Sequence, residues 1–229
     1  MAVLTWDDTG TREFETGVSQ GVLYVKGSSG YETGVAWNGL ISVTESPSGA
    51  EANDLYADDI KYAVIRSAED FGFTIEAYTY PDEFEQCDGA VSLMTGLTIA
   101  QQERKPFGFV YKSKIGDDEH PGIDKAYKLH IIYNATANPS ERQYQTINDS
   151  PEPINFSWEF TTVPVNVTGF KPTSYLIIDS TKFPKQQDGT KNAKLKAFED
   201  VLYGTDGEGT SAGTTARLPL PDEVKTLLT

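Results

Sequence analysis

Short segments in which apolar and polar residues alternate recur along this chain, and they constrain its fold more than any other feature. The clearest is residues 73–80, in which Phe73, Ile75 and Ala77 are each followed by a more polar neighbour. A period of two residues places the apolar side chains on one face of a β-strand. Further strands are predicted at residues 18–25, 35–44, 61–66, 106–114, 126–136 and 154–168, and a short apolar one at 175–179. The chain is therefore expected to be mainly β.

The pattern of a long amphipathic helix occurs late in the chain. Residues 191–203 place their apolar side chains on one stripe, and Gly204 follows as a helix end. Residues 81–87 predict a shorter helix, because the proline that opens this segment suits a first helical position. A flexible Gly-, Thr- and Ser-rich linker is expected at residues 205–215, and Pro221 can open one last helical turn.

A long polar segment interrupts the strand patterns at residues 45–59. Loops of this length inside a compact domain are usually functional or are ordered by a partner. The carboxylates of Glu51, Asp54, Asp58 and Asp59 raise the possibility of a calcium site, but the regular acid spacing, central glycine and terminal glutamate of a calcium loop are absent. We interpret the segment as a solvated or interface loop and predict no metal site.

Charge is distributed unevenly along the chain. Residues 31–90 hold thirteen Asp and Glu against two Lys and Arg, a net charge of −11 out of −15 for the whole chain. Four of these acids lie close together at Asp82, Glu83, Glu85 and Asp88. Such a field excludes a nucleic-acid binder and suits a surface that must not adhere to a polyanion.

A modest basic cluster lies near the expected late helix. It can be a solvated face, or it can bind the acidic segment of another copy of the chain. Contacts between unlike surfaces of identical copies build rings or open stacks. The cluster consists of Lys182, Lys185, Lys191, Lys194 and Lys196.

No set of residues makes a convincing catalytic site. Cys87 is the only cysteine and has no activating cation beside it in the sequence. His120 lies in an acidic turn without a nucleophile or an orienting group, and His130 reads as a packed strand residue. Glu76 and Glu159 resemble a glycosidase carboxylate pair, but strand glutamates commonly lie on the solvated face. We therefore expect no enzyme and no cofactor.

The chain is expected to fold in a reducing, aqueous compartment. Its first ten residues lack the basic and apolar regions of a signal peptide, and no apolar run is long enough to span a membrane. A single cysteine rules out an intrachain disulfide. We expect no membrane insertion by this chain.

Several segments taken in order along nearly the whole chain carry a family resemblance. They are GVSQGVLY (17–24), AWNGL (36–40), VTESPSGAEA (43–52), LYAD (55–58) with KY (61–62), FTIEAYTYPDEFEQCDG (73–89), RKPFG (104–108), FEDVLYG (198–204) and LPLP (218–221). Together they resemble the major tail proteins of long-tailed bacterial viruses, especially those infecting Gram-positive hosts. A tube protein of a contractile tail or of a virus-derived particle is a related possibility.

The resemblance implies a β-sandwich or half-barrel of two packed sheets with a flanking helix. It also implies hexameric rings in which one sheet of each subunit joins a continuous inner β-barrel. The expected organisation is an N-terminal arm at 1–17, a tail-tube domain at 18–203 and a C-terminal arm at 204–229. The loop at about 45–59 would reach the adjacent ring, with contact residues Glu45, Pro47, Glu51, Asp54, Leu55, Tyr56, Asp58 and Asp59.

The function implied by the resemblance is structural. Stacked rings would form a hollow tail tube that conducts viral DNA into the host without binding it specifically, and Glu76 and Glu159 are candidates for acids facing the lumen. Expected partners are other copies of the chain, a tape-measure protein, a tail terminator and baseplate or initiator proteins. The expected location is the virion tail, assembled in the cytoplasm of the host bacterium.

The alternative from another functional class is a carbohydrate-binding β-sandwich module of a virus or a cell surface. Its aromatic side chains would stack on sugar rings, and Trp6, Trp37 and Trp158 are the first candidates. Glycan binding by the isolated monomer would favour this alternative over the tube protein.

Overall fold

The strands of the body form one antiparallel sheet in a computed structural model that describes residues 3–119, 125–147, 149–186, 189–207 and 213–229. The sheet has nine strands in the order β2-β1-β12-β13-β14-β9-β4, with β15 also paired to β13 and β3 to β1. The strands are β1 (Phe14–Gly27), β2 (Gly30–Tyr31), β3 (Val35–Trp37), β4 (Leu40–Glu45), β9 (Gly72–Ala77), β12 (Phe107–Gly116), β13 (Ala126–Ala137), β14 (Phe156–Thr162) and β15 (Tyr175–Asp179).

The sheet curves so far that β4, at one end of the strand order, comes back beside β1. Its concave side encloses an aromatic core in which Phe84 contacts Trp37 and Trp158 at ring-centroid distances of 4.6 Å and 5.2 Å. The Phe84 and Trp158 rings meet edge to face at an interplanar angle of 76°, an arrangement that aromatic quadrupoles favour, and the Phe84 and Trp37 rings are tilted at 51°. The mainly β prediction is confirmed, and the two packed layers that we expected are two parts of one continuous sheet.

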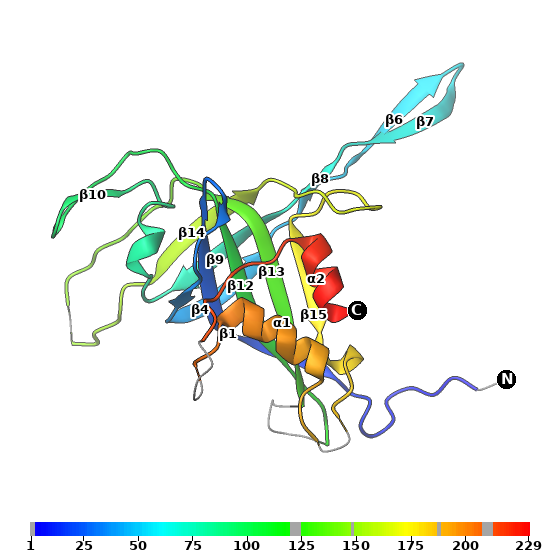
Figure 1. Cartoon of the computed structure of the whole chain (residues 1–229). Coiled ribbons are helices and arrows are strands. Elements are labelled where there is room, and N and C mark those ends of the chain that lie inside the picture. Colours follow the sequence, from blue (N-terminus) through cyan, green and yellow to red (C-terminus); the bar gives the residue numbers. More distant parts are fainter. Residues whose placement is uncertain (1–2, 120–124, 148, 187–188, 208–212) are drawn as a thin grey trace.

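Two helices cover part of the outer face of the sheet (Figure 1). They are α1 (Ala193–Tyr203) and α2 (Pro221–Leu228). Leu195 and Phe198 of α1 and Val224 of α2 pack with Leu129 and Ile131 of β13 in a second apolar cluster. The predicted flanking helix is therefore confirmed, because its apolar stripe is buried against the sheet.

The two ends of the chain differ in how they meet this body. Residues 3–13 precede β1: Gly10 and Glu13 contact Asp118 and Lys125 at the end of the β12–β13 pair, and the residues before them run away from the sheet in Figure 1. Near the other end, Leu218 and Val224 are 5% exposed and belong to the second apolar cluster, so residues 216–229 pack on their own sheet. The expected terminal arms at 1–17 and 204–229 remain proposals about assembly.

The prediction of a polar loop at residues 45–59 is wrong in its secondary structure. Most of the segment forms a ribbon of β5 (Ser48–Gly49) with β8 (Glu69–Asp70), followed by β6 (Ala52–Ala57) with β7 (Ile60–Arg66). Asp58 and Asp59 turn the chain with φ angles of 50° and 62°. Aspartate tolerates this left-handed conformation, and two such residues make the tight turn that joins paired strands.

Other predicted elements changed in length. The strand expected at 35–44 is broken between β3 and β4 at Gly39, whose φ of 75° suits glycine. The strand expected at 154–168 ends at Thr162, and the helix expected at 81–87 contains only a short 3₁₀ turn at Asp82–Phe84. A further hairpin, β10 (Val91–Met94) with β11 (Leu97–Ile99), was not predicted, although Thr95-Gly96 is a turn signal.

Candidate assembly surfaces

The ribbon of residues 48–70, here called the hairpin arm, projects from the body (Figure 1). Its neck is the β5–β8 pair, extended by a hydrogen bond of 3.2 Å from Ala50 N–H to Ala68 C=O. A side chain at Gly49 would place its Cβ 2.5 Å from the Ala68 oxygen, so only glycine fits there. The neck therefore holds the two ends of the arm together where the chain leaves and re-enters the body.

The hairpin arm exposes many large apolar side chains. A two-stranded ribbon has no layer behind it that can bury them, and an isolated hairpin is at best marginally stable in water. Apolar exposure on this scale is typical of surfaces that bind a partner. The exposed residues are Leu55, Tyr56, Ile60, Tyr62, Val64 and Ile65.

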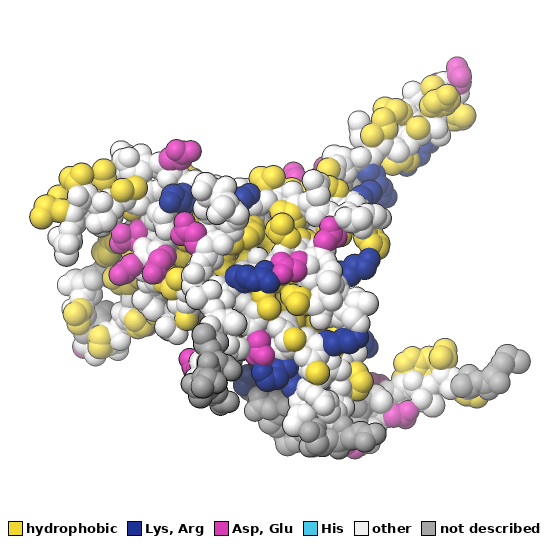
Figure 2. Space-filling model, viewed as in Figure 1, with side chains coloured by type: hydrophobic (Ala, Val, Ile, Leu, Met, Phe, Trp, Pro, Cys, Tyr) yellow, Lys and Arg dark blue, Asp and Glu magenta, His cyan; other side chains and the backbone are white. Residues whose placement is uncertain are grey.

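Four of the charged side chains of the hairpin arm lie in a cross-strand pair or at the turn. Lys61 Nζ is 2.7 Å from the Asp54 carboxylate across the ribbon. Asp58 and Asp59 form the turn, and Figure 2 shows acidic side chains at the far tip. Among the described residues, no group of three or more His, Cys, Asp or Glu side chains is arranged to hold a metal ion. The acids of the arm therefore shape its turn and its surface.

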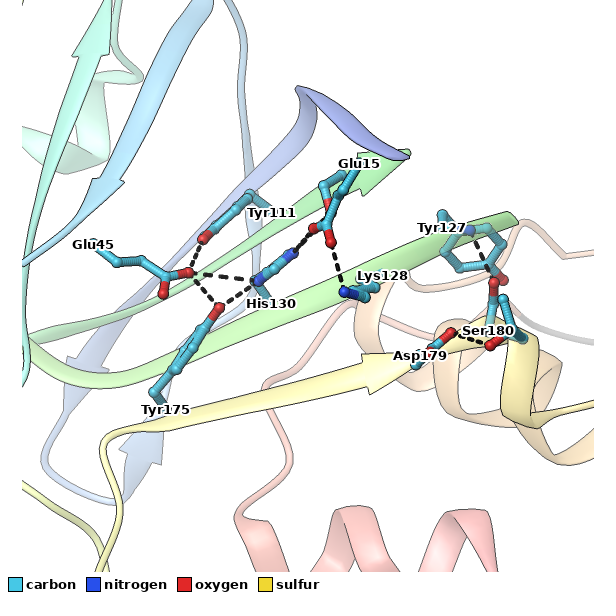
Figure 3. A network of polar contacts seen from close by, with 11 residues as sticks. Glu15, Glu45, Tyr111, Tyr127, Lys128, His130, Tyr175, Asp179 and Ser180 are labelled. Carbon is cyan, nitrogen blue, oxygen red and sulfur yellow. Dashed lines mark hydrogen bonds and ion pairs between the residues drawn. The ribbon is translucent and has the colours of Figure 1, made fainter. Parts of the chain in front are cut away.

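Glu45, the last residue of β4, anchors the base of the arm to the body (Figure 3). Its carboxylate accepts a hydrogen bond of 2.8 Å from the Tyr111 hydroxyl and a second one from the Tyr175 hydroxyl. His130 Nδ1 lies 3.7 Å from the same carboxylate. Glu45 was expected among the residues that reach another ring, but this geometry gives it an anchoring position.

The polar network continues from His130 to the start of β1. Ser113 Oγ lies 2.8 Å from His130 Nε2 and donates a hydrogen bond of 2.5 Å to Glu15, which also pairs with Lys128 at 2.5 Å. His130 is 6% exposed, as expected for a packed strand residue, and burial lowers its pKa against the opposing effect of Glu45 and Glu15. The Ser113 hydroxyl donates its hydrogen bond to Glu15, so His130 does not act as a base toward it. The network therefore links neighbouring strands and does not activate Ser113 as a nucleophile.

We predict that Glu15→Gln weakens the fold in a pH-dependent way. Burial raises the pKa of Glu15, but the Lys128 ammonium and the Ser113 hydroxyl overcome this and hold it below the ordinary value of 4.5. The stabilisation is therefore present above pH 4.5 and is lost as the pH falls through the folded-state pKa. Urea denaturation should show a deficit of roughly 0.5–1 kcal/mol at neutral pH, because the pair is partly exposed. A deficit that persisted unchanged in acid would contradict this.

Glu76 and Glu159, the two acids predicted to face a lumen, lie on one continuous sheet face. Across the ladders Ser157 pairs with Glu76 and Glu159 pairs with Thr74, while Ser42 Oγ donates a hydrogen bond of 3.0 Å to Glu76. Directly paired residues share a face. The side chains that the β4, β9, β14 and β13 ladders place on this polar sheet face are Ser42, Thr44, Thr74, Glu76, Thr136, Ser157, Glu159 and Thr161, with no cation and no large apolar group among them.

The basic cluster is largely engaged within the chain. Lys191 pairs with Glu199, Lys196 Nζ lies 2.6 Å from Asp200, and Lys194 donates to the Thr229 carbonyl. Among the described residues, Lys182 and Lys185 form no ion pair. A contact with another copy would therefore rely mainly on these two.

Of the other residues considered for sugar binding or catalysis, most lie in the core, one is exposed and one is outside the described residues. Trp37 and Trp158 are 2% and 1% exposed, so neither can stack on a sugar, and only Trp6 of the three is exposed. Cys87 is buried, which raises the pKa of its thiol to about 12. His120 lies outside the described residues. No helix in the described part of the chain has the length and apolar character needed to cross a membrane.

Comparisons with known proteins gave distant structural matches. No family model and no curated protein matched the sequence. One matching chain is from the sheath-tube complex of an extracellular contractile injection system, PVC, in its extended state, at 10% identity and a TM-score of 0.30 over 70% of this chain and 88% of that chain. Another is from the tube-terminating cap of the anti-feeding prophage AFP, at 9% identity and 0.33 over 78% and 96%.

Proposed function

We propose that this protein is a structural subunit that assembles into hexameric rings, and that the rings stack into the hollow tail tube of a bacterial virus. The hairpin arm carries the proposal. It exposes six large apolar side chains on a ribbon that its own body cannot cover. In a stack of rings, another copy of the chain lies next to this surface at high local concentration and can cover it permanently. The order of family-like sequence segments supports the same function.

In this proposal the arm connects successive rings. Tyr56 and Tyr62 are 70% and 72% exposed and supply most of the aromatic area that a neighbour can cover. Aromatic anchors of this kind usually dominate the energy of an interface. Glu45 stays with the body, and the reaching contacts belong to the residues beyond Ser48.

The polar sheet face suits the wall of a channel for DNA. Hydroxyl groups keep it wetted, and Glu76 and Glu159 repel phosphates, so that a duplex passes without being held. The proposed partners are further copies of the chain, a tape-measure protein, a tail terminator and baseplate or initiator proteins. The proposed location is the virion tail, with assembly in the cytoplasm of the host.

We predict that the double change Lys182→Glu and Lys185→Glu weakens assembly and leaves the monomer folded. Both side chains are outside the apolar clusters, and a chain of net charge −15 has few cations to offer an acidic neighbour. Sedimentation should show a higher concentration threshold for polymers. Lys196→Glu is the matched control, since Lys196 already pairs with Asp200. Equal thresholds for the double variant and wild type would exclude a role for these lysines.

The direct test is negative-stain electron microscopy of the purified chain over a range of concentrations, alone and with initiator proteins. Six-fold rings or hollow tubes are the expected result. A chain that stayed monomeric in all of these conditions and bound glycans instead would overturn the proposal in favour of the carbohydrate-binding module.

A further inference from the structure

The β10–β11 hairpin is a second projecting ribbon, separate from the hairpin arm (Figure 1). Residues 89–102, which contain it, include no charged side chain, although the chain carries a net charge of −15. Its large apolar side chains are between 37% and 65% exposed, and hydrophobic atoms dominate this end of the molecule in Figure 2. These residues are Val91, Leu93, Met94, Leu97 and Ile99.

The two faces of this hairpin differ in polarity. Val91 pairs with Ile99 and Met94 with Leu97, and a bulge between Ser92 and Met94 brings these four side chains onto one face. Ser92 pairs with Thr98 on the other face, and Thr98 Oγ1 lies 3.5 Å from Glu85 of the body. The polar face is thus turned toward its own chain, and the apolar face is left without a cover.

An uncharged cleft of about 690 Å³ lies elsewhere on the molecule. Residues 18–22 of β1, residues 36–40 and Tyr203 line it, and none of them is charged. In the described pairings, Phe14, Glu15, Thr16 and Ser19 of β1 pair with β12, while Val18 and Gln20, which line the cleft, have no ladder partner. The cleft therefore combines apolar walls with backbone groups of β1 that no strand of the same chain pairs.

We propose that the β10–β11 hairpin of one copy docks into this cleft of the next copy and closes the ring. The inference rests on the proposed self-assembly and assigns the surfaces that make its lateral contact. Copies that each carry a charge of −15 repel one another, so their closest contact is favoured where neither surface is charged. The hairpin and the cleft are different surfaces, so the contact is heterologous and repeats from copy to copy. The hairpin arm then stays available for the next ring.

Cysteine cross-linking tests the pairing of these two surfaces. One variant carries Met94→Cys and the other Asn38→Cys, an exposed position in the cleft. The native Cys87 does not interfere, because burial raises the pKa of its thiol to about 12 and shields it from oxidant. A mixture of the two variants, assembled and then oxidised, should give a disulfide-linked dimer. As a control, the Met94→Cys variant is mixed with a Thr226→Cys variant, whose cysteine is exposed on α2. The yield of disulfide-linked dimer should then be lower by about tenfold or more.

A second variant tests the energetic role of the apolar face. Leu97→Thr with Ile99→Thr keeps strand-forming residues and the absence of charge, so the monomer should unfold at the same temperature as wild type. We expect the concentration needed for ring formation to rise about tenfold or more, because two apolar contacts are lost. Ser92→Thr, on the polar face, is the matched control and should assemble like wild type.

The outcomes separate this inference from the proposed function. If wild type forms rings but the double variant forms them at the same concentration, or the cysteine pair gives no more dimer than the α2 control, the lateral contact is elsewhere and this inference is overturned. If wild type forms no rings or tubes in any condition, the proposed function itself fails. Cross-linking together with the raised threshold supports the inference.

Discussion

Excising the hairpin arm is expected to abolish tube formation while leaving the subunit folded. The change replaces residues 50–68 by Asn-Gly, a two-residue turn that joins the neck strands β5 and β8. The removed residues belong to neither apolar cluster, so the core loses no contact. The excision removes the apolar ribbon, which is the surface that we propose for the contact between stacked rings. Isolated rings are the expected largest assembly.

Electron microscopy of particle shape and thermal unfolding by circular dichroism are the measurements. The unfolding temperature should stay within about 2–4 °C of wild type, since less than about 1 kcal/mol of folding energy is at stake. Tyr56→Ser with Tyr62→Ser is the milder companion variant, because it keeps the ribbon and its charges but removes its aromatic area. It should give fewer and shorter tubes. Long tubes from the excised protein would show that stacking does not use the arm.

Phe84→Ala is expected to cost about 3–5 kcal/mol of unfolding free energy, the largest loss from any single change considered for this chain. Phe84 is fully buried, and its ring lies within 6 Å of the Trp37, Trp158 and Phe107 rings, measured between centroids. Truncation leaves a cavity among rigid aromatic rings, which cannot collapse to fill it. Because a domain of this kind is stable by only about 5–15 kcal/mol, a large part of its stability is at risk.

Urea denaturation followed by far-ultraviolet circular dichroism measures this loss without depending on tryptophan emission, which the change itself perturbs. Phe84→Leu is the control, because it keeps most of the apolar volume and should cost distinctly less. A loss below about 1 kcal/mol for Phe84→Ala would mean that the 3₁₀ turn does not hold the aromatic core together.

Local pattern was sufficient for the elements whose side chains alternate cleanly. The strand at 73–80, which the structure ends at Ala77, and the late helix were predicted because burial of one face leaves a periodic record in the residues. The strands at 126–136 and 175–179 are also observed, but they do not alternate cleanly, since residues 129–133 of β13 are buried on both faces. The prediction from local pattern failed at residues 45–59, where the polar composition indicated a loop but the chain forms a two-stranded ribbon. A two-stranded ribbon has no buried face, so its residues need not alternate, and the turn at Asp58-Asp59 depends on backbone conformation.

Strand pairing between distant segments decides which side chains share a surface, and local sequence pattern does not contain this information. Glu76 and Glu159 are far apart in the chain, and only the β9–β14 register places them on one polar face. Likewise, Glu45 and Glu15 meet around His130 because β4 comes back beside β1 when the sheet curves. Residue types and charge identified a mainly β, acidic chain. Which acids share a surface, which aromatic rings are buried and which ribbons project depend on contacts between distant segments, which leave no periodic signal in a single sequence.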